Sequence, residues 1–222
     1  VCDFLLGDKG VSEALQVVLD GQFFLLGANG DMTAAEVGLR DRKNGRLALK
    51  QALAEISDSF DYVIIDCPPA LSMLTVNALA AARGVIIPMQ CEYYALEGLS
   101  DLLETIESVR KMMNPELIIE GVLRTMHDPR NRLTGDVSAQ LIDYFGSAVY
   151  ETCIPRNVRL AEAPSHGVPI MQYDSAASGA TAYRQLAAEI LARDDSEVID
   201  APRKGARRAV SSLFGRRRRN AG

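Results

Sequence analysis

The sequence lacks the features of a histidine-based metal site, a membrane span, a signal peptide and a CxxC motif. Its two histidines, His127 and His166, are too few for a histidine-based metal site. No apolar run approaches the roughly 18 residues of a membrane span, and no signal-peptide pattern opens the chain. The four cysteines, which show no CxxC spacing, are Cys2, Cys67, Cys91 and Cys153. We therefore expect a cytoplasmic protein in which all four are reduced and buried.

Charge is distributed unevenly along the 222 residues. The net charge is −5, yet residues 201–222 carry eight basic residues and no acid, which leaves −5 − 8 = −13 for residues 1–200. This pattern indicates an acidic globular body, 1–193, followed by a polar linker and a basic tail, 194–222.

The hydrophobic pattern predicts alternating strands and helices. Short apolar runs predict strands at 22–28, 62–66, 84–89, 117–123 and 149–154. Helices are expected within 1–20, from the capping-box spacing Thr33–Glu36, and at 44–57, 74–83, 96–113, 137–145 and 179–193. This alternation predicts an α/β fold, with a doubly wound, mostly parallel sheet flanked by helices.

The stretch FDYVIIDCPPALS, residues 60–72, ends an apolar strand with an acid. Open α/β sheets bind ligands at the carboxyl ends of their strands, where such an aspartate can hold magnesium through water. Asp66 is therefore a candidate catalytic and metal-binding residue; the alternative is a strand-end aspartate that caps the next turn. A phosphate-binding loop needs Gly-Lys followed by Ser or Thr, and none of the five lysines follows a glycine.

Two longer segments resemble one family closely. FDYVIIDCPPALSMLTVNALAAARGVIIPMQCEYYALEGL and IPRNVRLAEAPSHGVPI are similar to the ParA/Soj family of chromosome-partitioning ATPases, which belongs with MinD to the deviant Walker A group of P-loop proteins. The resemblance covers residues 1–193. Members begin with a strand and a KGGVGKTT-type loop, and VCDFLLG resembles the segment just after that region. The resemblance thus implies a P-loop NTPase-like fold whose N-terminal P-loop strand is missing from this sequence.

The resemblance also implies roles for individual residues. Asp66 matches the Walker B acid that organises Mg²⁺, and Cys67–Ser72, with Pro68 and Pro69, match the segment that senses the γ-phosphate of ATP. Arg124–Asp128 and Ile154–Val158 resemble the loops around the adenine, where Met126, Pro155 and Asn157 are the expected contacts.

The family implies an ATP-dependent homodimer that binds DNA non-specifically, is associated with the nucleoid, and is stimulated by a ParB-type centromere-binding partner. Arg156, Arg159 and Arg184 are the candidate DNA contacts on the body, with surface ion pairs as the alternative. The basic tail is open to three interpretations: a solvated tail, a DNA-binding arm, or a membrane-surface helix like that of MinD. Two further hypotheses are a MinD-like positioning ATPase and a non-catalytic ParA-like interaction module. Without the loop, the 222 residues alone are expected to hydrolyse little ATP.

Overall fold

The computed structural model describes residues 1–19, 23–68 and 70–195 and divides them between two compact units. Unit 1 contains Val1–Gly84 and Glu104–Leu117, and unit 2 contains Val85–Leu103 and the chain from Ile118 onward, so helix α6 contributes to both. The predicted basic tail and Pro69 lie outside the described residues. None of the described helices is long and apolar enough to cross a membrane.

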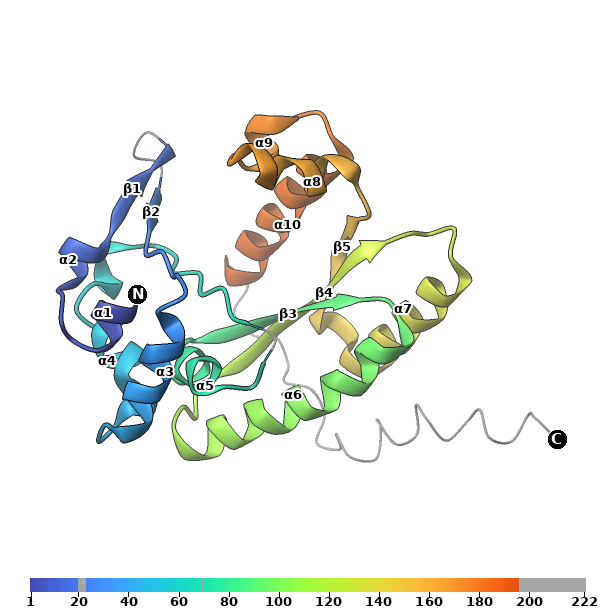
Figure 1. Cartoon of the computed structure of the whole chain (residues 1–222). Coiled ribbons are helices and arrows are strands. Elements are labelled where there is room, and N and C mark those ends of the chain that lie inside the picture. The colour runs from blue at the N-terminus through green and yellow to red at the C-terminus, as the bar shows by residue number, and fades with distance from the viewer. Residues whose placement is uncertain (20–22, 69, 196–222) are drawn as a thin grey trace. The chain divides into compact units, whose positions relative to one another are not determined.

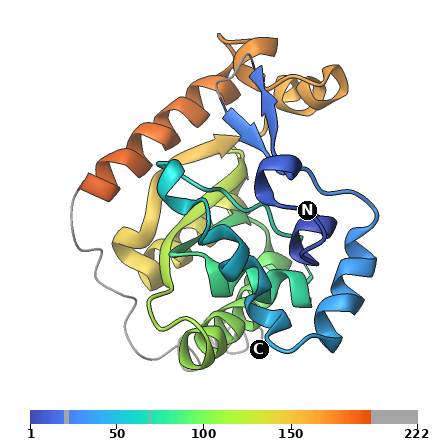
Figure 2. The ribbon, with the colours of Figure 1, turned by 90° about the vertical axis from the view of Figure 1, so that its left-hand side faces the viewer.

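Unit 2 is built on a three-stranded sheet with the order β3-β4-β5. β4 and β5 are parallel, and α10 packs on β5 (Figures 1 and 2). The α/β class is therefore confirmed. Its elements are β3 (Gly84–Gln90), α6 (Tyr93–Met112), β4 (Ile118–His127), α7 (Arg132–Phe145), η4 (Gly146–Ala148), β5 (Val149–Pro155), α8 (Val158–Glu162), η5 (Ala163–His166), α9 (Ile170–Tyr173) and α10 (Ser178–Asp195).

The core of unit 2 lies between β4, β5 and α10. Leu123, Tyr150, Ile154 and Leu186 form one buried cluster, with Ile190 packed against it. A Leu or Ile side chain removed from water contributes about 1.5–3 kcal/mol. The sequence pattern predicted these strands and this helix correctly because each buries an apolar face that its own periodicity defines.

Unit 1 is mainly helical. Its elements are α1 (Cys2–Leu5), α2 (Val11–Ala14), β1 (Gln16–Val18), β2 (Phe23–Leu25), α3 (Met32–Asp41), η2 (Gly45–Leu47), α4 (Ala48–Leu53), η3 (Ser57–Ser59) and α5 (Met73–Ala81). The Ser72 side chain caps α5 by accepting from the Leu74 N–H at 3.1 Å. Buried Leu39, Leu79 and Val109 belong to the core of this unit.

The first 25 residues differ from expectation. Instead of one helix within 1–20, the chain forms two four-residue helices, and Gly7 at φ +75° follows the end of α1. β1 and β2 pair antiparallel, whereas the predicted sheet is mostly parallel. The strand predicted at 22–28 is confirmed as β2, but its burial is not, because Phe23 and Phe24 are about half exposed.

Residues 62–66, predicted as a buried parallel strand, form no strand. Ile64 is 92% exposed, and Val63 is exposed as well. A strand requires a neighbour that shares its backbone hydrogen bonds, and the two sheets formed by the described residues, β1-β2 and β3-β4-β5, do not include this segment. An apolar run alone therefore did not determine the structure here.

Two smaller expectations also fail. The short helix expected from Thr33–Glu36 is confirmed as α3, but the capping box is wrong, because α3 begins after Asp31 and Glu36 instead accepts from the Met73 N–H at 3.2 Å. The expectation that all four cysteines are buried is confirmed only for Cys91, because Cys67 is exposed and Cys2 and Cys153 are half-buried. All four are free thiols.

Candidate nucleotide-binding site

The two loops predicted to surround an adenine meet at the carboxyl ends of β4 and β5. His127 ends β4 and lies opposite Pro155, the last residue of β5. The Arg156 N–H donates to the His127 carbonyl at 3.3 Å. Parallel strands of an α/β sheet present ligand-binding residues at this edge, so two segments about 30 residues apart in sequence form one candidate site.

Met126 occupies an unusual backbone conformation at this edge. Its φ is +50°, in the left-handed region that residues with a Cβ rarely adopt. The β4–β5 register is irregular between Arg124 and His127, and the Met126 side chain is 49% exposed. An irregularity of this kind redirects a side chain at a sheet end, and strained residues of this type are concentrated at ligand sites.

The turn after β4 is held by an ion pair that the sequence interpretation missed. The Asp128 carboxylate accepts from the Arg130 backbone N–H at 3.1 Å and from its Nε and terminal nitrogen at 2.9 and 2.8 Å. These bonds to Arg130, together with the charge of Arg156, lower the pKa of Asp128 to about 2. The Asp-Pro-Arg spacing was the available signal, since an aspartate commonly bonds the backbone two residues later.

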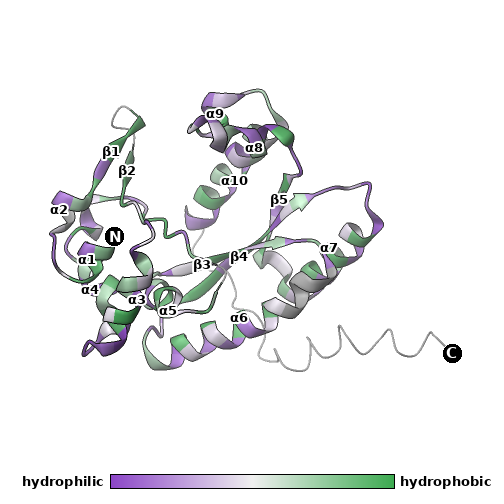
Figure 3. Ribbon diagram, viewed as in Figure 1, coloured by the Kyte–Doolittle hydropathy of each residue, from purple (hydrophilic) through white to green (hydrophobic). Residues whose placement is uncertain are grey.

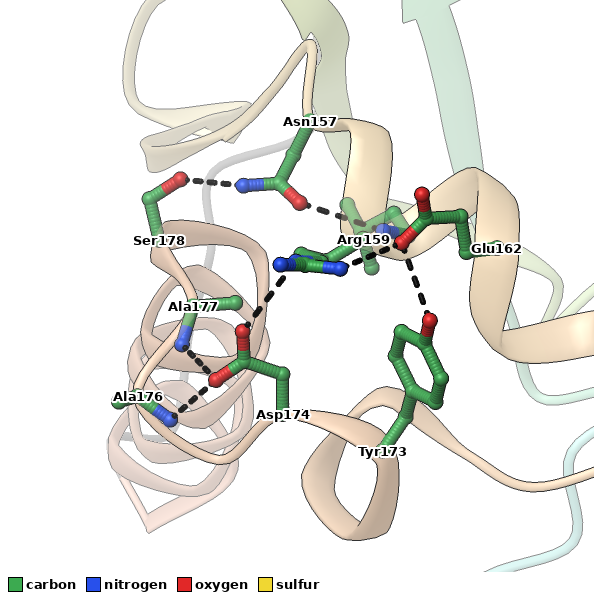
Figure 4. Close-up of polar contacts among 9 residues, drawn as sticks. Asn157, Arg159, Glu162, Tyr173, Asp174, Ala176, Ala177 and Ser178 are labelled. Carbon is green, nitrogen blue, oxygen red and sulfur yellow. Dashed lines mark hydrogen bonds and ion pairs between the residues drawn. The ribbon is translucent and has the colours of Figure 1, made fainter. Parts of the chain in front are cut away.

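Asn157 joins the end of β5 to two helices. Its side-chain oxygen accepts from the Leu160 N–H at 3.2 Å and caps α8, and its Nδ2 donates to the Ser178 hydroxyl at 2.7 Å (Figure 4). The amide is therefore engaged in fixing the loop Pro155–Asn157. Contact of Met126, Pro155 or Asn157 with a nucleotide stays a prediction.

The three arginines predicted to contact DNA differ in their surroundings. Arg159 pairs with Glu162 at 2.9 Å and with Asp174 at 3.6 Å, and the Tyr173 hydroxyl donates to the same Glu162 oxygen at 3.1 Å (Figure 4). Bonds from Arg159 and Tyr173 lower the pKa of the Glu162 carboxyl. Two acids thus neutralise Arg159 locally.

The other two arginines are less strongly held. Arg184 donates to the Ser175 carbonyl at 2.8 Å and to the Thr181 hydroxyl at 3.4 Å, without an acidic partner in the described part of the chain. The Arg156 side chain is exposed and makes no hydrogen bond or ion pair to another described residue. Of the three arginines, Arg159 forms the surface ion pair that was the alternative to a DNA contact.

Asp66 lies in unit 1, in the exposed segment that follows Ile65. Pro68 is exposed too, and Pro69 lies outside the described residues. Over the described ranges, no three His, Cys, Asp or Glu side chains come together as a metal site. A role for Asp66 in holding Mg²⁺ through water stays a prediction.

Comparison with known sequences gives consistent relatives. The sequence model of a family described as an AAA domain matches residues 1–119. The chain is 47% identical over 194 residues to the chromosome-partitioning ATPase Soj of Treponema pallidum, a match that covers 87% of this chain and 77% of the relative. It is 46% identical over 192 residues to the sporulation initiation inhibitor protein Soj of Bacillus subtilis, covering 86% and 76%.

Solved structures share the fold. Cobyrinic acid a,c-diamide synthase of Mycobacterium smegmatis, with bound ADP and magnesium, superposes with a TM-score of 0.75 at 36% identity, covering 92% of this chain and 76% of that one. The cell division ATPase MinD of Pyrococcus furiosus superposes with a TM-score of 0.65 at 20% identity, covering 86% and 75%. At 20% identity the likeness to MinD shows the fold alone.

Proposed function

Since this chain belongs to the ParA/Soj family of chromosome-partitioning ATPases, we propose that it acts in an ATP-dependent partitioning switch. In this proposal ATP with Mg²⁺ drives face-to-face dimerisation and non-specific binding to nucleoid DNA. A ParB-type centromere-binding protein then stimulates hydrolysis and release. The MinD-like alternative has no comparable support, because the MinD likeness is limited to the fold.

The observation that best supports this function is the meeting of the two loops at the β4–β5 edge. His127 and Pro155 are opposite each other, and the Arg156 N–H closes the two loops with one hydrogen bond. The exposed Met126 side chain, displayed by a strained backbone, supplies an apolar surface of the kind that a planar base requires. This edge fits the base end of a nucleotide.

These 222 residues supply only part of what binding the phosphates of a nucleotide requires. Asp66 supplies a carboxylate of the kind that Mg²⁺ prefers, and bound Mg²⁺ would neutralise charge on the phosphates. No glycine in the sequence is followed by lysine, so a phosphate-cradling lysine with its nest of backbone N–H groups is not available. Because positioning and charge stabilisation carry most of phosphoryl-transfer catalysis, we expect negligible hydrolysis by the 222 residues alone.

The test compares the purified 222-residue chain with a fusion in which a relative's Gly-Lys loop segment precedes Val1. We expect Mg²⁺-dependent ATP hydrolysis only from the fusion, with stimulation by the cognate ParB-type protein and DNA. Asp66→Asn should abolish this activity, whereas Asp61→Asn, a neighbouring exposed acid, should retain it. Hydrolysis that Asp66→Asn leaves unchanged, or an inactive but folded fusion, would contradict the proposal.

A further inference from the structure

The turn between α3 and α4 presents three cations that the prediction of DNA contacts did not include. Lys43, Arg46 and Lys50, here called the basic turn, are exposed and make no hydrogen bond or ion pair to any other residue that the structure describes. Two neighbouring arginines are engaged: Arg40 pairs with Glu36 at 3.3 Å, and Arg42 donates to the Leu5 carbonyl at 3.2 Å. The turn is strongly hydrophilic in Figure 3.

The backbone that carries the basic turn is fixed in an uncommon conformation. Asn44 has φ +67°, in the left-handed region where Asn is better tolerated than most residues. Gly45 approaches the Leu39 carbonyl so closely that a Cβ would lie 1.8 Å from its oxygen. Only glycine fits at this point, so the sequence Asn-Gly specifies the turn.

A buried side chain from α5 holds the other side of the turn. Asn77, 1% exposed, donates to the Gly45 carbonyl at 2.8 Å and accepts from the Leu49 N–H at 3.1 Å. Arg46 lies inside this clamped segment, and Lys50 follows it directly. The cations are therefore attached to a rigid frame, which lowers the entropic cost of ordering a bound partner.

Charge repulsion within the turn is not relieved by an acidic partner. Arg46 lies in η2 and Lys50 follows four residues later in α4, and neither of these like charges has an acidic partner among the described residues. Residues 1–200 carry a net charge of −13, so acids are abundant elsewhere in the body. Cations without acidic partners in such a body form a surface suited to a polyanion.

The surroundings favour nucleic acid over a membrane as that polyanion. A membrane-surface helix needs an exposed apolar stripe beside its cations. The apolar residues of this segment, Leu47, Leu49 and Leu53, are half-buried, and η2 and α4 pack on α5. The exposed face thus offers charge without apolar surface, which suits the phosphodiester backbone of DNA, contacted without sequence readout.

We propose that the basic turn is a contact for the phosphate backbone of duplex DNA, an inference that rests on the DNA binding in the proposed function. Lys43, Arg46 and Lys50 each neutralise one phosphate. The contact belongs to unit 1 and is separate from Arg156, Arg159 and Arg184, which belong to unit 2.

The test measures binding of a fluorescein-labelled duplex of arbitrary sequence by fluorescence anisotropy, at several salt concentrations. With ATP and Mg²⁺ present, the fusion that carries the Gly-Lys loop segment before Val1 is compared with the same fusion carrying Lys43→Gln, Arg46→Gln and Lys50→Gln. Each lost phosphate contact should reduce the slope of log K against log[salt] by about 0.9, so the slope should fall by about 2.7 in total. The single change Arg46→Gln should lower it by about 0.9.

A matched control removes three cations that are paired with acids: Lys9→Gln, Arg110→Gln and Lys111→Gln. It changes the net charge equally and should leave the slope unchanged. Both variants are also made with Arg216, Arg217, Arg218 and Arg219 replaced by Gln, so that binding by the tail cannot hide the effect. Circular dichroism verifies that each variant is folded.

Three outcomes would overturn the inference. They are an equal loss of slope in the control, no binding of DNA by a fusion that hydrolyses ATP, and a loss of binding to phosphatidylglycerol vesicles but not to DNA when the basic turn is neutralised. The proposed function is tested separately. The fusion that carries the Gly-Lys loop should keep its Asp66-dependent hydrolysis when the basic turn is neutralised, so loss of the DNA contact and loss of ATPase activity are distinguishable.

Discussion

Replacing Asn77 with alanine tests whether one buried amide holds the α3–α4 connection. Asn77 is 1% exposed on α5, and its side chain bonds the Gly45 carbonyl at 2.8 Å, the Met73 carbonyl at 3.1 Å and the Leu49 N–H at 3.1 Å. The Leu49 N–H lies in the first turn of α4, where backbone donors have no partner within the helix.

The expected cost follows from the groups left without a partner. The Gly45 carbonyl and the Leu49 N–H each lose the bond to Asn77, and a buried polar group without a bond costs about 1–3 kcal/mol. The sum is about 2–6 kcal/mol; we expect about 3 kcal/mol, because water can reach part of an exposed turn. At 1.4 kcal/mol for each factor of ten, the unfolded fraction should rise more than a hundredfold.

Two measurements check this prediction. Urea unfolding followed by circular dichroism gives the free energy of unfolding, and hydrogen exchange at the Leu49 amide reports the turn itself. Asn131→Ala is the matched control: Asn131 is exposed and caps α7 through the Leu133 N–H, so its loss should cost about 1 kcal/mol. A cost for Asn77→Ala below 1 kcal/mol, or unchanged protection of the Leu49 amide, would refute the reasoning.

Three further predictions concern the sheet of unit 2. Met126→Gly should raise the free energy of unfolding by about 0.5–1 kcal/mol, because glycine adopts φ +50° without the Cβ clash; denaturant unfolding measures this, and Met126→Ala should show no gain. The pKa of Asp128, held at about 2 by Arg130 and Arg156, lies below its usual value of about 3.9. The folded carboxyl therefore releases its proton more readily than the unfolded one, so the stability it contributes should be complete above about pH 4 and lost as the pH falls through about 2. Unfolding of Asp128→Asn across that range should lack this component. Burial raises the pKa of Tyr150 to about 12, so the folded state keeps a proton that the unfolded chain loses near pH 10. Stability should fall between about pH 10 and 12, and Tyr150→Phe should remove that dependence.

The local hydrophobic pattern was sufficient to predict a helix or strand where that element has an apolar face of its own. α6 was expected from the spacing of its leucines, and Leu99, Ile106 and Val109 are indeed buried. β3 was expected from the continuous apolar run at 84–89 and β5 from the strand pattern at 149–154, and both belong to the sheet of unit 2. In these elements the periodicity of the sequence and the direction of burial agree, so no information from distant residues was needed.

Pattern was insufficient where structure depends on a partner distant in sequence. Residues 62–66 have the composition of a buried strand, but Ile64 is almost fully exposed because no described strand pairs with this segment. Glu36 has the spacing of a capping box, but its carboxylate serves the Met73 N–H, 37 residues away. In both cases a local motif could not report what decides the structure, which is the lack of a neighbouring strand among the described residues for 62–66 and the distant Met73 N–H for Glu36.

The candidate DNA-binding arginines and lysines also could not be identified from local sequence, because their ion pairs depend on the fold. Arg159 was selected for its place in a family motif, yet Glu162 and Asp174 already hold its guanidinium, so binding a phosphate would require breaking an existing pair. Lys43 and Arg46 belong to no such motif and have no acidic partner in the described structure. Residues 1–200 carry a net charge of −13, so most cations there have an acid within reach, and a group of cations without one needs a backbone that holds it away from acids. Asn77 supplies that frame from α5. The surface open to a polyanion is therefore set by which cations the fold leaves unpaired.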